Sequence, residues 1–300
     1  MNFFERKDNC LYFRGDGELV RLSPWGQNAI RVESALMDQI PAGEIALLKA
    51  ESVQPEISLL DERHAKMRNG KITANLFVQP WGNGLQITFT DRAGKVLLQE
   101  ISDGGALTRK ARSFQHLSGG NYRLKATFAA DSNEKIFGMG QYQQEIFNLK
   151  GCNLELAHRN SQASIPFYLS DLGYGFLWHN AAIGEVHFGL NTTEWVAQST
   201  KKLDYWITAG DSPSEIEERF AAVTGKVPMM PEYGLGFWQC KLRYYEQEQV
   251  LSVAREYKKR GIPVDVIVID YYHWPRCGDW RFDTEYFPDP KAMVSELRGR

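Results

Sequence analysis

The 300-residue sequence predicts two kinds of fold in one chain: an N-terminal antiparallel β-sandwich, and then an α/β region with parallel strands. Up to about residue 210, short runs of alternating apolar and polar residues are separated by turn sequences. Beyond residue 211, helix patterns alternate with strand patterns. The first arrangement is typical of a sandwich, and the second is typical of parallel strands joined by helices.

The sandwich prediction comes from three stretches in particular. Residues 10–34, CLYFRGDGELVRLSPWGQNAIRVES, contain alternating runs on either side of a Gly-Asp-Gly turn. Residues 70–101 repeat the pattern with Gly-Asn-Gly and Arg-Ala-Gly turns, and residues 164–180, SIPFYLSDLGYGFLWHN, add further strand patterns. Alternation with a period of two indicates strands that bury one face, so these stretches predict half-buried antiparallel strands.

The change of pattern begins with a predicted helix that ends at Gly225. Asp211 or Ser212 is suited to the N-cap, and Pro213 follows in the first turn, where proline is favoured. The predicted helix has one apolar face, because its apolar residues recur at i, i+4 and i+7; they are Ile216, Phe220 and Val223.

After a proline-rich connector, the sequence predicts a strand over 233–240, a helix over 246–261, a strand over 264–270 and a helix after Pro290. The second strand, VDVIVID, is β-branched and almost unbroken, as in strands that are covered on both faces. A closed (β/α)8 barrel needs about 250 residues, and this region has far fewer. We therefore expect a fold that is truncated within this sequence.

Composition argues against several partners. The formal net charge is −2 with both signs interspersed, so no basic surface for nucleic acid or for an acidic membrane is predicted. The N-terminus has charged residues and no apolar core of a signal peptide, and no apolar run reaches the length of a membrane span, so a cytoplasmic protein is expected. The scattered cysteines have no metal-binding spacing and predict free thiols without a metal or cofactor; they are Cys10, Cys152, Cys240 and Cys277.

Asp270 is the leading candidate for a functional residue, because it is the acid at the C-terminal tip of a predicted inner strand. Carboxyl ends of parallel strands face the ligand site in α/β folds. A carboxylate there can accept two hydrogen bonds from a sugar diol. The alternative is a structural role, in which Asp270 caps a turn or pairs with Arg276 or Arg281.

Aromatic residues crowd the positions after Asp270. Sugar rings pack their C–H faces on aromatic planes, so a carboxylate among rings predicts a carbohydrate site. For any single ring, a role in filling the loop is an equal alternative. His273 lacks a partner His or Cys nearby, which favours a packed or hydrogen-bonded histidine over a metal ligand or base. The rings in question are Tyr271, Tyr272, Trp274 and Trp280.

A glycine-rich stretch, FGMGQYQQ at 137–144, lacks the third glycine and the lysine of phosphate-binding loops. We expect a tight turn that leads into a polar loop, from which Gln141, Gln143 and Gln144 could contact a ligand.

Two segments resemble glycoside hydrolase family 31. The stretch from GDSPSEIEERF to PEYGLGFWQCK, followed by GIPVDVIVIDYYHW and FPDPKAMVSELR, is similar to that family's domain junction and first two barrel strands. The stretch 164–180 is similar to its N-terminal β-sandwich. The resemblance therefore implies a sandwich over 1–228 and the first two βα units of a (β/α)8 catalytic barrel, incomplete, over 229–300. YYHWP and GDWRFD look most like the bacterial α-xylosidase-like members.

The family implies a retaining, exo-acting enzyme on α-linked sugars, with one aspartate as nucleophile and another as acid/base through a covalent glycosyl intermediate. The family's sequence motifs around these two aspartates are not found in this sequence, so no catalytic residue is expected within this chain. Asp270 matches the aspartate that binds the non-reducing sugar in the −1 subsite. The positions that match walls of this subsite are Lys241, Tyr271 and Tyr272, and Trp274 is added as a substrate-binding ring.

The resemblance leads to an α-xylosidase hypothesis, because bulky Tyr271 and Tyr272 suit the exclusion of the C6 group of a hexose. The expected partner is an α-linked oligosaccharide or an α-xyloside, and a homo-oligomer is left open. An α-glucosidase of the same family is the first alternative. A non-catalytic sugar-binding fragment is the alternative from another class, and a lyase or transglycosylase on the same scaffold is a third.

Overall fold

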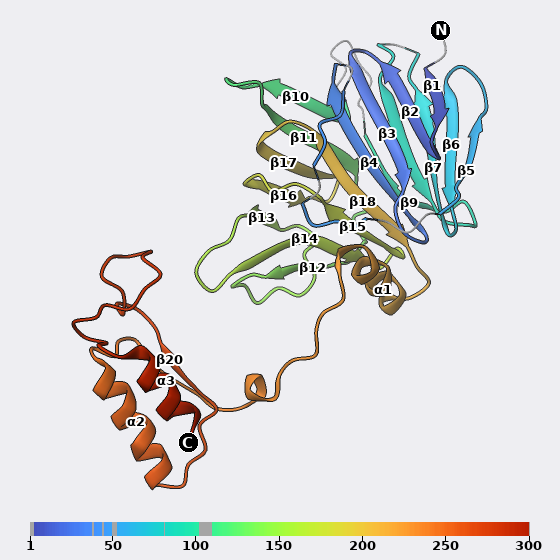
Figure 1. Ribbon diagram of the computed structural model, residues 1–300. Helices are drawn as coiled ribbons and strands as arrows, with labels where there is room; N and C mark the ends of the chain where they lie inside the picture. The colour runs from blue at the N-terminus through green and yellow to red at the C-terminus, as the bar shows by residue number, and fades with distance from the viewer. Residues whose placement is uncertain are drawn as a thin grey trace. The chain divides into compact units, whose positions relative to one another are not determined.

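The computed structural model describes residues 3–37, 39–43, 45–49, 53–80, 82–101 and 110–299. The chain divides into two units, residues 1–226 and residues 227–300, each with its own internal packing (Figure 1).

The described part of the first unit contains three antiparallel sheets, which confirms the predicted sandwich. One sheet has the order β1 (Phe4–Lys7), β2 (Cys10–Gly15), β3 (Glu18–Pro24), β4 (Ala29–Leu36), β18 (Leu203–Ala209), β15 (Tyr174–Trp178), β14 (Ala163–Ser170) and β12 (Ile136–Gln141). The second has the order β10 (Arg112–His116), β11 (Tyr122–Ala129), β17 (Thr192–Thr200), β16 (Gly184–Phe188) and β13 (Asn153–Leu156). The third has the order β5 (Glu56–Leu59), β6 (His64–Asn69), β7 (Ile72–Val78), β8 (Leu85–Thr90) and β9 (Val96–Gln99).

The three sheets share one hydrophobic core. In β7 every second residue is buried, as the alternating sequence predicts. An isolated bridge between Glu100 and Phe128 joins the end of β9 to β11, so the second and third sheets meet. Aromatic rings fill the interior, and those of Trp178 and Trp195 stack with centroids 5.5 Å apart.

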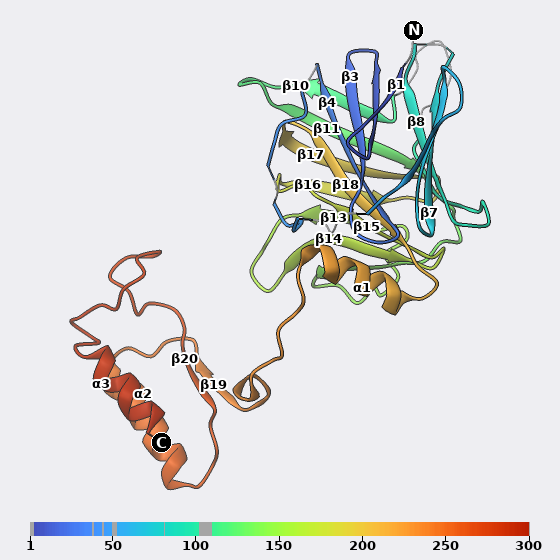
Figure 2. The ribbon, with the colours of Figure 1, turned by 45° about the vertical axis from the view of Figure 1, so that its right-hand side comes forward.

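Helix α1 (Pro213–Thr224) closes one side of the first unit and follows the predicted caps. The Ser212 side chain accepts a hydrogen bond from the Glu215 backbone N–H. The Gly225 N–H donates to the Ala221 carbonyl at 2.9 Å, with Gly225 at a φ of 112° that favours glycine. Helix α1 lies against β15 and β18 (Figure 2). The ring of Phe220 in this helix stacks on that of Phe167 in β14, with the ring centroids 3.9 Å apart. A local sequence pattern therefore fixes both ends and the buried face of this helix.

A buried charge network joins distant strands of the first unit. The Arg31 guanidinium in β4 donates to both carboxylate oxygens of Asp204 in β18, at 2.9 and 2.6 Å. Burial on its own would raise the pKa of Asp204, but hydrogen bonds from Arg31 and His179 outweigh it and lower this pKa to about 2. The His179 Nδ1–H faces the same carboxylate at 3.0 Å, and its Nε2 accepts the Ala46 N–H at 3.0 Å. The network fixes the position of residues 45–47 on the sheet.

Residues 137–141 of the glycine-rich stretch belong to the edge strand β12 and do not form the expected tight turn, while residues 142–144 lie in the loop that follows. The pairing of β12 with β14 is irregular between Gly138 and Gly140. A Cβ at Gly140 would lie 2.3 Å from the Ala163 carbonyl oxygen, so the close approach of the two strands requires glycine there. Gln141 ends this strand, and Gln143 and Gln144 are exposed in the loop that follows.

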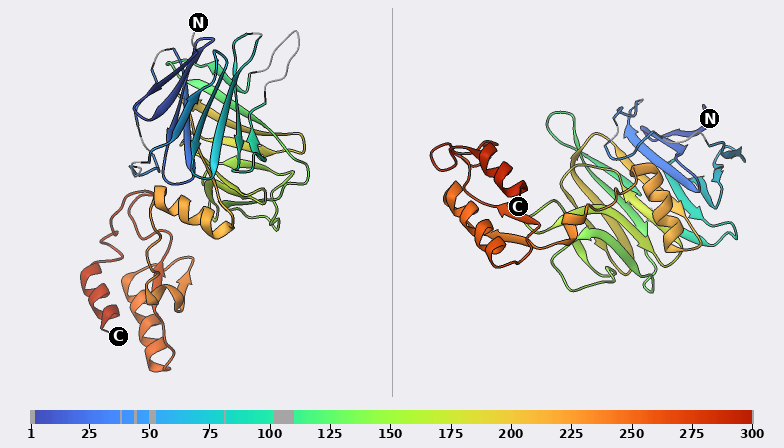
Figure 3. Two further views of the ribbon diagram at one scale, coloured as in Figure 1. Left: turned by 90° about the vertical axis from the view of Figure 1, so that its right-hand side faces the viewer. Right: turned by 60° about the horizontal axis from the view of Figure 1, so that its bottom comes forward.

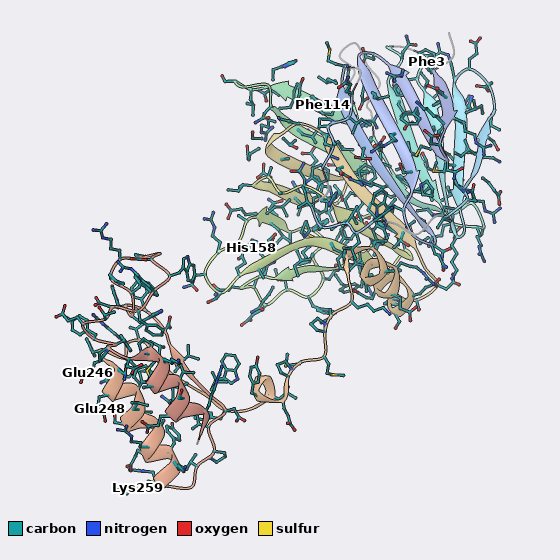
Figure 4. The ribbon with its side chains drawn as sticks, viewed as in Figure 1. Phe3, Phe114, His158, Glu246, Glu248 and Lys259 are labelled. Carbon is teal, nitrogen blue, oxygen red and sulfur yellow. The ribbon has the colours of Figure 1, made fainter. Side chains whose placement is uncertain are left out.

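The second unit has two parallel strands and two helices. They are β19 (Trp238–Lys241), α2 (Gln247–Lys259), β20 (Val266–Ile269) and α3 (Pro290–Arg298). The two helices lie side by side in both views of Figure 3 and share a small core around Tyr244, Leu251 and Met293. Glu246 and Glu248 lie at the N-terminal end of α2 and Lys259 at the other end, an arrangement that complements the helix dipole (Figure 4).

Two details of the second unit differ from the prediction. The expected strand at 233–240 begins with a 3-10 turn, Glu232–Leu235, and only its second half is β19. Gly236 ends that turn, and a Cβ at this position would lie 2.1 Å from the Asp265 carboxylate. The same carboxylate accepts a hydrogen bond from the Phe237 N–H. The residues of β20 are only half-buried, because α2 and α3 cover one face of the two-stranded sheet.

None of the helices in the described ranges combines the length and the apolarity that crossing a lipid bilayer requires.

Candidate functional site

The candidate site lies at the carboxyl ends of β19 and β20. In the parallel register Gln239 is opposite Ile267, Cys240 is opposite Val268, and Lys241 is opposite Ile269. Ile267 and Ile269 pack into the core with α2 and α3. Since side chains alternate along a strand, the other face carries Cys240 and Val268, and Asp270 follows on that face.

Asp270 is an exposed carboxylate that directly follows β20. Its Oδ2 lies 4.0 Å from the Cys240 Sγ, a contact at the limit for a thiol hydrogen bond. Among the described residues no ion pair involves Asp270, and Arg281, one of the two suggested partners, pairs with Asp279 at 2.9 Å. The carboxylate oxygens are therefore available to accept hydrogen bonds from a ligand.

Lys241 ends β19, but the strand register places it on the helix-covered face, opposite to that of Cys240. Its Nζ lies 6.0 Å from the centroid of the buried Tyr244 ring. The long side chain of Lys241 is exposed at the edge of the sheet. A role of Lys241 in the subsite stays a prediction.

The predicted rings come together in the loop after β20. The Tyr271 ring lies 3.9 Å from that of Tyr272 and 5.6 Å from that of Trp274, in both cases steeply inclined. Hydrogen bonding with Tyr272 raises the pKa of the Tyr271 phenol, which keeps it neutral and able to donate. Trp280 is fully exposed, and the ring contacts of the described residues do not include it. Three of the four aromatic residues thus form one cluster beside Asp270.

His273 has a structural role in this loop. Its Nδ1 lies 2.8 Å from the Asp270 carbonyl oxygen, and only a protonated Nδ1 can donate to that acceptor. The His273 carbonyl in turn accepts the Asp283 N–H at 2.8 Å. These two bonds fix the loop to the end of β20, in agreement with the interpretation of His273 as a hydrogen-bonded residue.

Sequence reasoning missed two residues at this edge. Cys240 is the neighbour of Asp270 across the sheet, and strand alternation would have found it once the register was known. Arg243 lies in the loop after β19 with its guanidinium carbon 4.5 Å from the Tyr272 ring centroid. A contact between two loops has no signal in the local pattern of either.

Within the described ranges, no three His, Cys, Asp or Glu side chains come together as metal ligands do. All four cysteines are free.

A cavity of about 640 Å³ in the first unit is a weaker candidate. Its lining carries both charge signs, and these charges already neutralise one another. Lys110 pairs with Asp16, Arg112 pairs with Glu18, and Lys125 pairs with Glu194. A ligand would have to displace these internal partners, whereas Asp270 forms no ion pair with the residues that the structure describes.

Comparison with known families finds a match to the second unit. Residues 227–300 match the model of the glycosyl hydrolases family 31 TIM-barrel domain. A curated relative from Pseudescherichia vulneris, described as an uncharacterized family 31 glucosidase, is 46% identical over 96% of this chain and 57% of its own length. An α-xylosidase from Saccharolobus solfataricus is 30% identical over 76% of this chain and 33% of its own length.

A solved structure is similar over nearly the whole chain. The crystal structure of a family 31 α-xylosidase from a soil metagenome, complexed with xylose, has a TM-score of 0.89 and 44% identity. The alignment covers 99% of this chain and 45% of that one. Both sets of comparisons agree that this chain spans about half the length, or less, of the proteins it matches. The sandwich and the two βα units therefore correspond to an N-terminal sandwich and the start of a TIM barrel.

Proposed function

Because this chain belongs to glycoside hydrolase family 31, we propose that it forms the first part of a retaining, exo-acting α-glycosidase that removes α-linked xylose from non-reducing ends. In this proposal the first two βα units supply substrate-binding groups. The nucleophile and the acid/base, two aspartates of later barrel strands, are expected outside these 300 residues, and they act through a covalent glycosyl intermediate.

The observation that carries the proposal is the exposed carboxylate of Asp270 at the carboxyl end of β20, which forms no ion pair with any described residue. In a (β/α)8 barrel that end of each strand faces the substrate. A carboxylate there accepts charge-assisted hydrogen bonds from two neighbouring sugar hydroxyls, which fixes the ring relative to the catalytic groups. Asp270 is thus proposed to bind the sugar of the −1 subsite, with Tyr271, Tyr272 and Trp274 as its apolar walls.

Selectivity for xylose is attributed to the two tyrosines. A hexose differs from xylose by one CH2OH group, and rings that occupy its space would discriminate by about 1–3 kcal/mol. The names of two similar proteins, an α-xylosidase and an α-xylosidase with bound xylose, support this assignment. The relative with 46% identity is described as a glucosidase, which keeps α-glucosidase as the second candidate.

The test compares kcat/KM of the complete protein, meaning this chain with any sequence that follows it in its gene, on aryl α-xyloside and aryl α-glucoside. We expect at least a tenfold preference for the α-xyloside, since about 1.4 kcal/mol corresponds to a factor of ten. The aryl β-xyloside is the matched control and should not react. A tenfold preference for the glucoside would contradict the α-xylosidase proposal and support an α-glucosidase. Binding of xylose without hydrolysis of either substrate would support a sugar-binding protein.

A further inference from the structure

Tyr272 has a backbone conformation that needs support from its surroundings. Its φ is +68°, in the left-handed region that a bulky side chain seldom adopts. Its side chain is 52% exposed, so burial in a core does not hold it. A wall of a sugar site must nevertheless be rigid if it is to exclude one hydroxymethyl group.

Arg243 supplies this support from another loop. It lies between β19 and α2, and its guanidinium carbon is 4.5 Å from the Tyr272 ring centroid and 4.6 Å from the Tyr245 ring centroid. Both distances are those of cation–π contacts. One planar cation therefore joins the first βα loop to the second. Its contact in the second loop is Tyr272, two positions after Asp270.

The polar contacts of Arg243 indicate that the rings are its main partners. Its Nε is buried and has no hydrogen-bond partner within the described ranges. No carboxylate of the described residues forms an ion pair with it, whereas Arg255 of the same unit pairs with Glu248 and Glu296. A guanidinium placed between two rings without a carboxylate is suited to hold those rings and not to neutralise a charge.

We propose that Arg243 is a positioning residue that holds Tyr272 as a fixed wall of the sugar subsite, and that it thereby contributes to the choice of xylose over glucose. The inference rests on the proposed function for its substrate class, but the contact between the two loops is independent of it. The role is indirect, because Arg243 acts through the tyrosine ring.

The test is a double-mutant cycle in the complete protein with Arg243→Met, Tyr272→Ala and the two together. Arg243→Met keeps the side-chain length and removes the cation. We expect it to lower the ratio of kcat/KM on aryl α-xyloside to that on aryl α-glucoside at least fivefold, mainly through a lower KM for the glucoside, whose hydroxymethyl group is no longer excluded. Tyr272→Ala should lower the ratio at least as much, and the double variant should be no worse than Tyr272→Ala, because both changes remove the same wall.

Two control variants complete the kinetic test. Arg243→Lys retains a cation for the rings without the planar stacking surface, so its ratio should fall between those of the wild type and Arg243→Met. Arg260→Met removes a surface arginine that pairs with Glu256 and should leave the ratio within twofold of the wild type. A wild-type ratio in Arg243→Met, or effects of the two substitutions that multiply in the double variant, would overturn the proposal.

A crystal structure of the Arg243→Met variant separates this inference from the proposed function. The inference predicts a displaced or disordered Tyr272 ring, whether or not the protein hydrolyses either glycoside. An unchanged Tyr272 would contradict the positioning role even in an active α-xylosidase. A displaced Tyr272 in a protein inactive on both substrates would support the positioning role and overturn only the enzyme assignment.

Discussion

Two aspartates, one in each unit, differ in burial and in hydrogen bonding. Asp204 in the sandwich is buried and accepts hydrogen bonds from Arg31 and His179. Asp270 at the end of β20 is exposed, and the described hydrogen-bond contact of its carboxylate is one distant thiol. A carboxylate that the fold already satisfies has little left to offer a ligand, whereas one that the fold leaves open can bind a ligand. The difference separates a residue that stabilises the fold from one that is proposed to bind substrate.

The largest expected effect is on stability. Asp204→Asn removes the buried carboxylate that accepts two hydrogen bonds from the Arg31 guanidinium, so the free energy of unfolding should fall by about 3–5 kcal/mol. Urea unfolding of the protein measures the change. Asp211→Asn is the matched control, because Asp211 is highly exposed and pairs with Lys71 at the surface; it should cost at most about 1 kcal/mol. Equal effects of the two substitutions would remove the distinction between buried and exposed acids.

A smaller effect is expected in acid. The pKa of Asp204 is lowered to about 2 in the folded protein, below the value of about 3.9 in an unfolded chain. Its stabilising contribution is therefore fully present above about pH 4 and is lost as the pH falls toward 2. The loss should be about 2 kcal/mol, at about 1.4 kcal/mol per pKa unit.

The control for this pH dependence is the Asp204→Asn variant, which has no carboxyl group to titrate at this position. Unfolding free energies between pH 4 and pH 2 should fall less steeply in this variant than in the wild type. Parallel curves would show that Asp204 is not the group responsible.

Local sequence patterns predicted the elements whose determinants are local. The caps of α1 at Ser212 and Gly225 follow from side chains within one turn of each helix end. The position of Asp270 follows from a β-branched run that ends in an acid. In these cases the residues that decide the structure are close neighbours in the chain.

Contacts between distant segments were not predicted. Arg31 and Asp204 are 173 residues apart, and nothing in β4 alone indicates that β18 lies beside it. The face on which Lys241 lies depends on the register of β19 with β20, and that register comes from tertiary packing. The turn at 232–235 replaced half of a predicted strand, because Gly236 allows the Asp265 carboxylate to approach the backbone. Pairing partners and register are decided by tertiary contacts, which a single sequence does not reveal.

The central claim is that Asp270 binds substrate and does not stabilise the fold. The direct test measures kcat/KM on aryl α-xyloside and the melting temperature of the complete protein with Asp270→Asn. Loss of the ionic acceptor should lower kcat/KM by about 100-fold or more, since hydrogen bonds to charged groups contribute about 1.5–3 kcal/mol each and Asp270 is proposed to make two. The melting temperature should stay within about 2 °C of the wild type, because no described ion pair is lost. Near-wild-type kinetics, or a melting temperature that falls as it does for Asp204→Asn, would contradict the account.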